Sequence, residues 1–373
     1  MAGIYIHIPF CRKACHYCDF HFSTTLNLLD DIVDAIILEA ESMKNYIQEP
    51  IETIYFGGGT PSLLEKKHLD KIVSALYKHY SISNSIEFTL EANPDDLTEE
   101  KIQHFSSIGV NRLSIGTQSF HDSDLSFLNR SHTAKQTKQA VELCNKHNIN
   151  NLSLDLMYGI PNQTEKQWKQ NLEEMVHINP NHISCYSLTI EEKTVFGNWK
   201  RNGKLVPVAD EHIIDEYEYM VEYLTSYGYQ HYEVSNFSKP HKHSKHNSSY
   251  WHQKSYLGLG PGAHSFNGNS RHFNISSNPK YLKSIGNDTS HFTQETLTTN
   301  ELVTEYIFTR IRTKWGVDFN VITKLFNYHL STAQLNYITT IVSEKMATFV
   351  NNKLILNSKG FFISDTIVLE LIP

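Results

Sequence analysis

The sequence has little of several features that would assign it to a protein class at once. Only five of its 373 residues are cysteine, and no uninterrupted apolar run approaches the roughly 18 residues of a transmembrane helix. Seventeen glycines and 11 prolines are too few for long disordered tracts. Lys and Arg form no basic cluster, and the formal net charge is -7. We therefore exclude a disulfide-stapled miniature domain, a membrane-spanning chain and a nucleic-acid-binding protein.

The cysteines that are present are unevenly distributed. Cys11, Cys15 and Cys18 lie within eight residues, a spacing that indicates metal binding in a reducing compartment. The apolar N-terminus runs straight into Cys11 and lacks the basic start of a signal peptide, so we expect a cytoplasmic protein, with peripheral membrane contact left open. Cys144 and Cys185 lie in helical and apolar stretches, and we expect both to be inert core thiols.

Short apolar runs alternate with helical patterns through the first half of the chain. The sequence predicts six strands, at Gly3–Ile8, Glu52–Phe56, Ser85–Glu91, Arg112–Ser119, Asn151–Tyr158 and His182–Leu188. Helical spacing occupies Leu29–Tyr46, Leu64–Tyr80, Ala134–Lys146 and Glu165–His177, and Ser62 with Glu65 has capping-box spacing just after Pro61. Alternating strands and helices imply parallel pairing, so the fold class is α/β, with a partial (βα)6 barrel over residues 1–205.

Two further regions follow the barrel. Residues 206–297 mix a helix with aromatic and His-rich loops, which predicts an elaboration beside the barrel. Residues 298–373 show helical patterns followed by two strands, Lys353–Leu356 and Phe361–Glu370, joined at Asn357–Gly360. This order predicts a C-terminal α+β winged-helix-like domain. Because it lacks a basic cluster, a packing or lid role is favoured over DNA binding.

The three clustered cysteines permit two kinds of site. Three thiolates can hold an iron–sulfur cubane and leave one iron with an open coordination position, since most such clusters take four thiolates. Alternatively, His16, Asp19 or His21 can complete a tetrahedral zinc site. The spacing alone does not separate the two.

Polar residues at the predicted strand ends favour the cluster. Barrels of this kind assemble their sites at the carboxyl ends of the strands. Strand 1 leads to the cysteines, strand 2 to Gly57–Pro61, and the next three strands end near Glu91, Gln118 and Asp155. Glycines allow close backbone approach, and the polar side chains can bind ribose hydroxyls or an ammonium group.

These residues resemble the coproporphyrinogen III dehydrogenase family of radical S-adenosylmethionine (SAM) proteins over nearly the whole chain. The matching stretches are Tyr5–Cys11 with Cys15 and Cys18, Gly57–Ser62, Glu91–Pro94, Arg112–Phe120, Leu128–His132 and Asp155–Pro161. The resemblance implies a [4Fe–4S] cluster on the three cysteines, with SAM chelated by the open iron. It also implies SAM contacts at Tyr5, Gly58 and Glu91. Residues around a second SAM in the dehydrogenases are matched by Tyr17, Gly59, Thr60, Gln118, Arg130 and Asp155.

Departures from the dehydrogenase pattern point to another branch of the family. The dehydrogenases have a fourth cysteine where this chain has Phe20, and an N-terminal extension precedes their cysteines. Together with His246-Asn-Ser-Ser-Tyr-Trp251, these features resemble the heme-chaperone branch. The resemblance implies heme binding by His246, Asn247, Tyr250 and Trp251. An imidazole is a common axial heme ligand, whereas a solvated His-rich loop or adventitious metal binding is the alternative.

We therefore predict a heme chaperone that carries a cluster and SAM and delivers heme to a recipient such as a respiratory hemoprotein. The alternative is an oxygen-independent dehydrogenase that decarboxylates two propionates of coproporphyrinogen III to vinyl groups. A zinc-stabilised barrel without radical chemistry is a third hypothesis.

Overall fold

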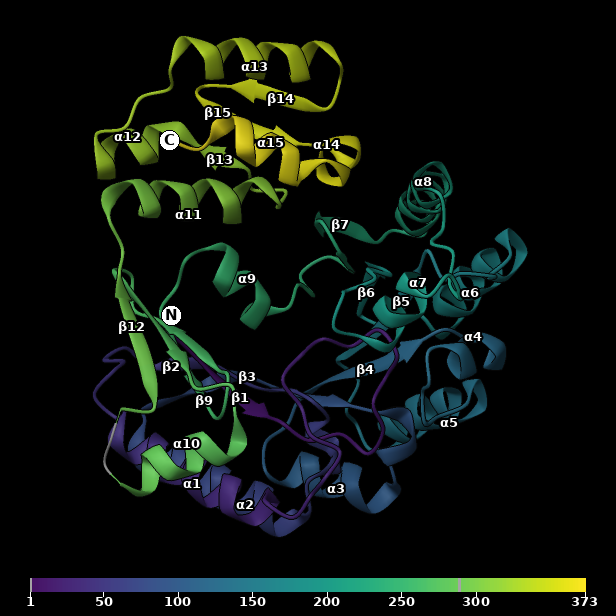
Figure 1. Cartoon of the computed structure of the whole chain (residues 1–373), viewed down its shortest axis with the longest axis vertical. Helices are drawn as coiled ribbons and strands as arrows, with labels where there is room; N and C mark the ends of the chain where they lie inside the picture. Colours follow the sequence, from purple (N-terminus) through teal and green to yellow (C-terminus); the bar gives the residue numbers. More distant parts are fainter. Residues whose placement is uncertain (1, 288–289) are drawn as a thin grey trace.

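Six parallel strands form the centre of the molecule, seen in Figure 1. The computed structural model describes residues 2–287 and 290–373. The six strands neighbour one another in chain order and are β1 (Ala2–Ile8), β2 (Ile51–Gly58), β3 (Ile82–Ala92), β4 (Arg112–Gln118), β5 (Leu152–Tyr158) and β6 (His182–Ser187). The predicted partial barrel is thus confirmed, and all carboxyl ends meet at one edge, as parallel pairing requires.

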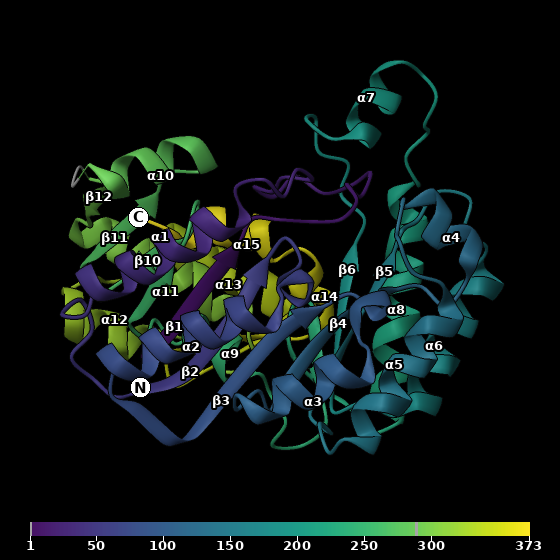
Figure 2. The same ribbon diagram turned by 90° about the horizontal axis from the view of Figure 1, so that it is seen from below.

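Helices cover the outer face of the curved sheet (Figure 2). They are α1 (Leu29–Ser42), α2 (Lys66–His79), α3 (Glu99–Ser107), α4 (Asp122–Phe127), α5 (Ala134–Lys146), α6 (Glu165–Ile178) and α8 (Asp210–Ser226), with 3₁₀ turns at Pro61–Leu63 and Pro94–Asp96. Helix α7 (Val195–Arg201) lies instead beyond the carboxyl end of β6. Apolar residues of the strands and helices form one core, in which Ile6, Phe56, Leu90 and Trp168 are almost fully buried. Cys144 and Cys185 lie in this core, as predicted, and burial raises the pKa of the Cys144 thiol to about 12.

The start of α2 differs from the prediction. Ser62 lies in the 3₁₀ turn, where its hydroxyl donates to Asp96 Oδ2 at 2.8 Å, and the helix begins at Lys66. The capping box is formed instead by Glu65 and His68. Ser62 thus has a tertiary partner that local spacing does not reveal. Helix α1 also ends earlier than predicted, at Ser42 rather than Tyr46.

The region after the barrel extends the sheet at both edges. Antiparallel β8 (Asn236–Ser238) and β7 (Gln230–Glu233) follow β6. On the other side, β9 (Tyr256–Leu259) pairs parallel with β1, and β10 (His264–Phe266), β11 (Ser270–Asn274) and β12 (Phe292–Thr296) follow it. The same region contributes α9 (Lys245–Trp251) and α10 (Asn278–Gly286).

The C-terminal unit has a core of its own and lies above the barrel in Figure 1. Its elements are α11 (Thr299–Ile311), β13 (Val317–Asp318), α12 (Phe319–Phe326), α13 (Thr332–Ser343), β14 (Ala347–Val350), β15 (Lys353–Leu356), α14 (Ser358–Phe362) and α15 (Ser364–Leu371). It joins the barrel through main-chain bonds, such as Lys314 N to Tyr232 O at 2.9 Å.

The predicted strand Phe361–Glu370 is wrong, because most of this segment is helical in α14 and α15. The hairpin partner of β15 is β14, which precedes it. Asn351 and Asn352, both with positive φ, form the two-residue turn that such hairpins favour. Asn357 instead caps α14, where its side chain accepts from Gly360 N.

No helix in the two described ranges has the length and apolar character needed to cross a membrane.

Candidate functional site

A cavity of about 560 Å³ lies at the carboxyl ends of the strands. It brings together every residue predicted to bind the cluster or SAM except Tyr5: Cys11, Cys15, Cys18, Tyr17, Gly58, Gly59, Thr60, Glu91, Gln118, Arg130 and Asp155. Convergence of residues from five strand ends is the expected arrangement for a barrel site. We call this space the cysteine cavity.

The cysteine loop is held at its base and along its length. At the base, Cys11 N donates to Ser23 O at 3.0 Å and Ser23 N donates to Pro9 O at 2.9 Å. Further along, Asn129 Nδ2 donates to Ala14 O at 2.7 Å, and Phe196 N in α7 donates to His16 O at 3.0 Å. Figure 2 shows this purple loop and α7 at the same end of the barrel. All three cysteines remain only half-buried, on the cavity wall.

Two polar side chains lie against the thiols. Arg130 Nη1 is 3.4 Å from Cys15 Sγ, and Thr60 Oγ1 is 3.5 Å from Cys11 Sγ. Arg130 Nη2 also donates to Asn93 Oδ1 at 2.7 Å and to Gly116 O at 2.9 Å. Burial raises the pKa of the Cys11 thiol, and the hydrogen bond from Thr60 opposes this shift. Three half-buried thiols on one cavity wall, two of them with a polar side chain against the sulfur, fit a cubane cluster.

The two histidines of the zinc alternative each have one ring nitrogen hydrogen bonded elsewhere. His16 Nδ1 is hydrogen bonded to Phe127 O at 2.9 Å, and His21 Nε2 donates to Asn278 Oδ1 at 2.8 Å. Asp19 is exposed at the end of the loop. In the described part of the chain, no three His, Cys, Asp or Glu side chains are grouped to hold one ion.

Gly58 and Gly59 allow β2 to pass directly against β1. Gly58 has φ +107°, and a Cβ there would lie 2.7 Å from the ring of His7. A Cβ on Gly59 would lie 2.5 Å from Phe10 O. Any larger residue would therefore push the strand away from the cysteine loop, and the freed backbone faces the cavity.

Glu91 lies half-buried beneath this glycine turn. Tyr55 donates its hydroxyl to Glu91 Oε1 at 2.7 Å, and Gly58 N donates to Oε2 at 3.2 Å. Burial raises the pKa of Glu91 to about 7, although both hydrogen bonds oppose the shift. The carboxyl group is thus held in place and can change its charge near neutral pH.

Asp155 and Gln118 complete the far wall. Burial raises the pKa of Asp155 to about 6, while a hydrogen bond from Ser184 lowers it. Its Oδ1 atom is buried and has no hydrogen-bond partner among the described residues. Gln118 adopts a left-handed backbone with φ 66° at the end of β4, an uncommon conformation that is typical of functional sites. Both side chains are therefore placed for a ligand within the cavity.

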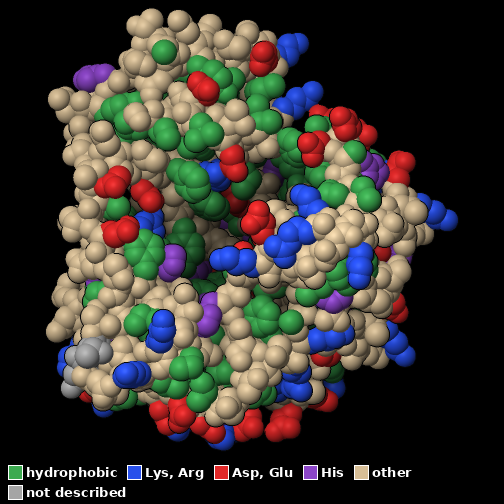
Figure 3. Space-filling view, viewed as in Figure 1, with side chains coloured by type: hydrophobic (Ala, Val, Ile, Leu, Met, Phe, Trp, Pro, Cys, Tyr) green, Lys and Arg blue, Asp and Glu red, His purple; other side chains and the backbone are tan. Residues whose placement is uncertain are grey.

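A second cavity, of about 480 Å³, adjoins the first. The two share Phe20, Gly58 and Glu91. Tyr5, the one predicted SAM contact outside the cysteine cavity, lines this second space, together with Tyr250 and Trp251 of the predicted heme motif. Figure 3 shows the molecule hollowed near its centre, with hydrophobic and histidine side chains at the margin. We call this space the aromatic cavity.

His246, the first residue of the heme motif, does not present a free nitrogen to either cavity. Its Nδ1 is 2.8 Å from Thr53 Oγ1, its Nε2 is 2.7 Å from the Tyr250 hydroxyl, and the side chain is buried. Burial lowers the pKa of its ring to about 3. Asn247 is half-buried in α9 and lines neither cavity. In this conformation the imidazole does not fit the predicted role of axial heme ligand.

Comparisons with known proteins place this site in a family. A profile described as Radical SAM superfamily matches residues 5–175. A protein from Lactococcus lactis subsp. lactis named heme chaperone HemW is 34% identical over 364 residues, covering 97% of this chain and 95% of the relative. The chain belongs to the HemW family of radical SAM proteins.

Further similarities support the HemW assignment. A HemW protein of Bacillus subtilis is 36% identical over 324 residues, which cover 85% of each chain. The solved structure of coproporphyrinogen III oxidase (HemN) from Escherichia coli aligns with a TM-score of 0.86 over 99% of this chain and 89% of that one. Their sequence identity is 18%, so this likeness concerns the fold.

Sequence reasoning missed several residues of this HemW-family site. Tyr55 and Asn93 hold Glu91 and Arg130, respectively. Tyr55 lies two residues before Gly57 on a strand, and this spacing, which places both on one face, was the available signal. His264 lines the aromatic cavity from β10, but its short strand carries no distinctive pattern.

Proposed function

We propose that this chain is a heme chaperone that holds a [4Fe–4S] cluster and SAM in the cysteine cavity and heme in the aromatic cavity, and passes heme to a recipient hemoprotein. The observation that carries the proposal is the contact between two chemically different cavities, which share Phe20, Gly58 and Glu91. The name of the L. lactis relative, heme chaperone HemW, supports the same hypothesis.

In the cysteine cavity, Cys11, Cys15 and Cys18 would hold the cluster. Gly58 and Glu91 would bind SAM through a backbone group and a carboxylate that accepts from ribose hydroxyls. The chemistry that such a site supplies is one-electron reduction of SAM to methionine and a 5′-deoxyadenosyl radical.

The remaining predicted residues shape the cavity. Arg130 keeps the cysteine loop close to β4 through its contacts with Cys15 and Gly116 O. Tyr17, Thr60, Gln118 and Asp155 line the wall and would orient a bound nucleoside or exclude water from it.

In the aromatic cavity, Tyr250 and Trp251 would lie against a flat macrocycle. Phe20 is 73% exposed and lies at the border of the two cavities, where the dehydrogenases of the family have a cysteine. An aromatic ring at this border suits contact with a porphyrin, and the cluster site beside it would gate binding or release. The recipient would be a hemoprotein such as a respiratory enzyme at the cytoplasmic membrane face.

A parallel anaerobic assay tests the proposal. Protein reconstituted with iron and sulfide is divided between two reactions. One contains hemin and the apo form of a b-type respiratory hemoprotein, and the other contains coproporphyrinogen III, SAM and a one-electron reductant. We expect heme transfer in the first reaction and no consumption of porphyrinogen in the second.

The alternative function gives the opposite result. A dehydrogenase would release two CO2 per porphyrinogen and form two vinyl groups, with transfer of hemin no faster than from free solution. That outcome would overturn the proposal. A Cys15→Ala variant is the control, because porphyrinogen turnover that depends on radical chemistry must disappear in it.

A further inference from the structure

Among the described residues, three histidines line the aromatic cavity, and they differ in how many of their ring nitrogens are hydrogen bonded. Both ring nitrogens of His7 are hydrogen bonded: the Tyr5 hydroxyl donates to Nδ1 at 3.1 Å, and Nε2 is 3.0 Å from His21 O. His21 uses Nε2 to bind Asn278. His264 is exposed to the cavity, and within the described ranges neither of its ring nitrogens is hydrogen bonded.

The position of His264 on the sheet places its ring among aromatic residues. Within β10, His264 and Phe266 lie on one face, whereas Ser265 lies on the other and accepts from Gly258 N at 2.9 Å. Phe266 pairs with Tyr256 of β9, and His264 pairs with Phe273 of β11. The His264 ring contacts Phe273 edge-on at 4.8 Å between centroids. An unpaired imidazole thus projects from an aromatic wall.

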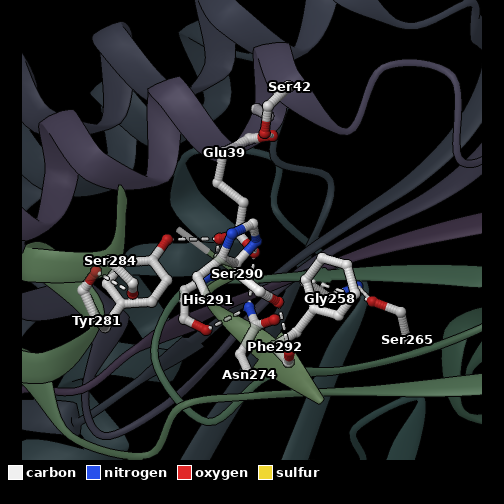
Figure 4. Close-up of polar contacts among 12 residues, drawn as sticks. Glu39, Ser42, Gly258, Ser265, Asn274, Tyr281, Ser284, Ser290, His291 and Phe292 are labelled. Atoms are coloured by element: carbon white, nitrogen blue, oxygen red, sulfur yellow. Dashed lines mark hydrogen bonds and ion pairs between the residues drawn. The ribbon is translucent and has the colours of Figure 1, made fainter. Parts of the chain in front are cut away.

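A buried polar network fixes the turn that leads to His264. Figure 4 shows Glu39 of α1 at its centre, with Asn274, Tyr281 and His291 around it. Asn274 Nδ2 donates to Glu39 Oε1 at 2.6 Å, and His291 Nε2 is 3.0 Å from the same oxygen. Gly260 N, in the turn between β9 and β10, donates to Glu39 Oε2 at 2.7 Å. The network ties the turn to the barrel, so the backbone next to His264 is held rigidly.

The heme motif itself supplies another part of the cavity wall. Tyr250 contacts Tyr256 edge-on at 4.6 Å, and its hydroxyl is fixed by His246. Trp251 lines the same space, and its buried Nε1 has no partner in the described parts of the chain. His246 therefore acts behind the wall and positions Tyr250, without reaching the cavity.

The residues that line the cavity include an exposed cation. Lys254 lines the cavity, is exposed, and has no ion pair among the described side chains. Arg271, by contrast, is bound to Glu305 through two nitrogens and stacks 5.0 Å above Phe266. A free ammonium beside an aromatic cavity matches a ligand with a flat apolar body and a peripheral carboxylate.

We infer that His264 supplies the axial nitrogen to heme iron in the aromatic cavity, and that Lys254 pairs with a heme propionate. This inference rests on the proposed function and refines it, since it moves the iron ligand from His246 to a residue outside the recognised motif. His246 becomes a positioning residue. The macrocycle then lies beside Gly58 and Glu91, at the border of the cysteine cavity.

Hemin titration of four proteins tests the assignment: wild type, His264→Ala, His246→Gln and His21→Ala. His21 is the matched control, because it lines the same cavity but is engaged with Asn278. Each titration is followed by visible absorption and electron paramagnetic resonance, and circular dichroism checks folding. For His264→Ala we expect loss of the imidazole-ligated signature and at least about 10-fold weaker binding, comparable to other disrupted metal sites.

Free imidazole should restore the lost signature in His264→Ala, because it can occupy the space that the side chain vacates. His246→Gln and His21→Ala should retain the signature. An unchanged spectrum in His264→Ala, or its loss only in His246→Gln, would overturn the ligand assignment while leaving heme binding intact. Failure of the wild-type protein to bind one hemin per chain would instead overturn the proposed function, and the assignment with it.

Discussion

The cysteine loop and the heme-motif segment are both recognisable in the sequence, but their side chains differ in exposure and hydrogen bonding in the structure. The thiols of Cys11, Cys15 and Cys18 lie on a cavity wall, half-exposed, in a loop anchored through its backbone. The imidazole of His246 is buried with both nitrogens hydrogen bonded. One motif thus presents its ligand atoms, whereas the other uses its histidine to build the wall of a cavity.

The reason lies in where each segment sits relative to the sheet. The cysteine loop follows the carboxyl end of β1, where a barrel leaves its strand ends open. Helix α9 packs instead beside β1 and β2, and Glu87 of β3 accepts from the backbone of Lys245 and His246. A histidine in its first turn therefore points into the packed interface between helix and sheet.

The largest expected effect is the difference in cluster content between Cys15→Ala, which changes a cavity cysteine, and Cys144→Ala, which changes a core cysteine. Cys15→Ala should abolish the visible absorption of the reconstituted cluster, since three thiols line the cavity among the described residues and the cluster needs all of them. Cys144→Ala should retain the cluster and lose only about 1 kcal/mol of unfolding free energy, because it removes one buried sulfur. Absorption and iron analysis after reconstitution measure both. A cluster that survives in Cys15→Ala would show that another ligand set is used.

His246→Ala should destabilise the fold by about 3 kcal/mol, from the cavity it leaves and from the unpaired hydroxyls of Thr53 and Tyr250. His177→Ala, at an exposed position in the last turn of α6, should change stability by less than about 0.5 kcal/mol. Urea unfolding of the apoproteins measures the difference. Equal stabilities would mean that His246 is not packed as described, and that its imidazole is free to bind iron.

Glu91 provides a test based on pH in the protein without SAM. Burial raises its folded pKa to about 7 from a usual value of 4.5, so the folded state binds a proton more tightly than the unfolded state. Its contribution to stability is therefore greatest at low pH and falls as pH rises between those values. From pH 5 to pH 7 the wild type should lose about 2 kcal/mol relative to Glu91→Gln.

The Gln side chain can also change the unfolding free energy by an amount that does not depend on pH. This change does not affect the test, because only the variation of unfolding free energy with pH is compared. Urea unfolding across this range provides the slopes. Parallel pH profiles of the two proteins would contradict a raised pKa of Glu91 in the folded state.

Phe20→Ala should have the smallest effect on stability and on hemin binding. Phe20 lies at the border of the two cavities. Since Phe20 is 73% exposed, its removal should change stability by less than about 0.5 kcal/mol. Hemin affinity should fall about 2- to 10-fold, the range expected for one lost aromatic contact. Tyr77→Ala, an exposed aromatic on α2, is the control and should leave hemin binding unchanged. Equal hemin affinities in both variants would place the porphyrin away from the border of the cavities.

Much of the fold and of the cysteine cavity could be predicted, because the local apolar pattern of these segments also determines where their ends lie in the folded protein. Buried strands such as β5 and helices such as α5 follow from the apolar spacing, and parallel pairing then places all strand ends together. Glu91, Gln118 and Asp155 could be named as site residues on that ground alone.

What could not be predicted depended on partners distant in sequence. The hydroxyl of Ser62 binds Asp96 and does not cap a helix. The segment Phe361–Glu370 is rich in aromatic and β-branched residues, as strands are, but most of it lies in two short helices of the C-terminal unit. The orientation of His246 is another such case, because Thr53 and Tyr250 decide it together. His264 carried no signal, since its importance arises only where β10 meets the aromatic cavity.

The central claim is that thiols bind the cluster and an imidazole binds heme in two separate cavities. The most direct test is an anaerobic hemin titration of reconstituted wild type and of Cys15→Ala, with heme, iron and sulfide quantified per chain. We predict one heme per chain in both proteins with the same imidazole-ligated spectrum, and cluster iron and sulfide only in the wild type. Loss of heme binding together with the cluster in Cys15→Ala would contradict the claim, because a thiolate would then be ligating heme.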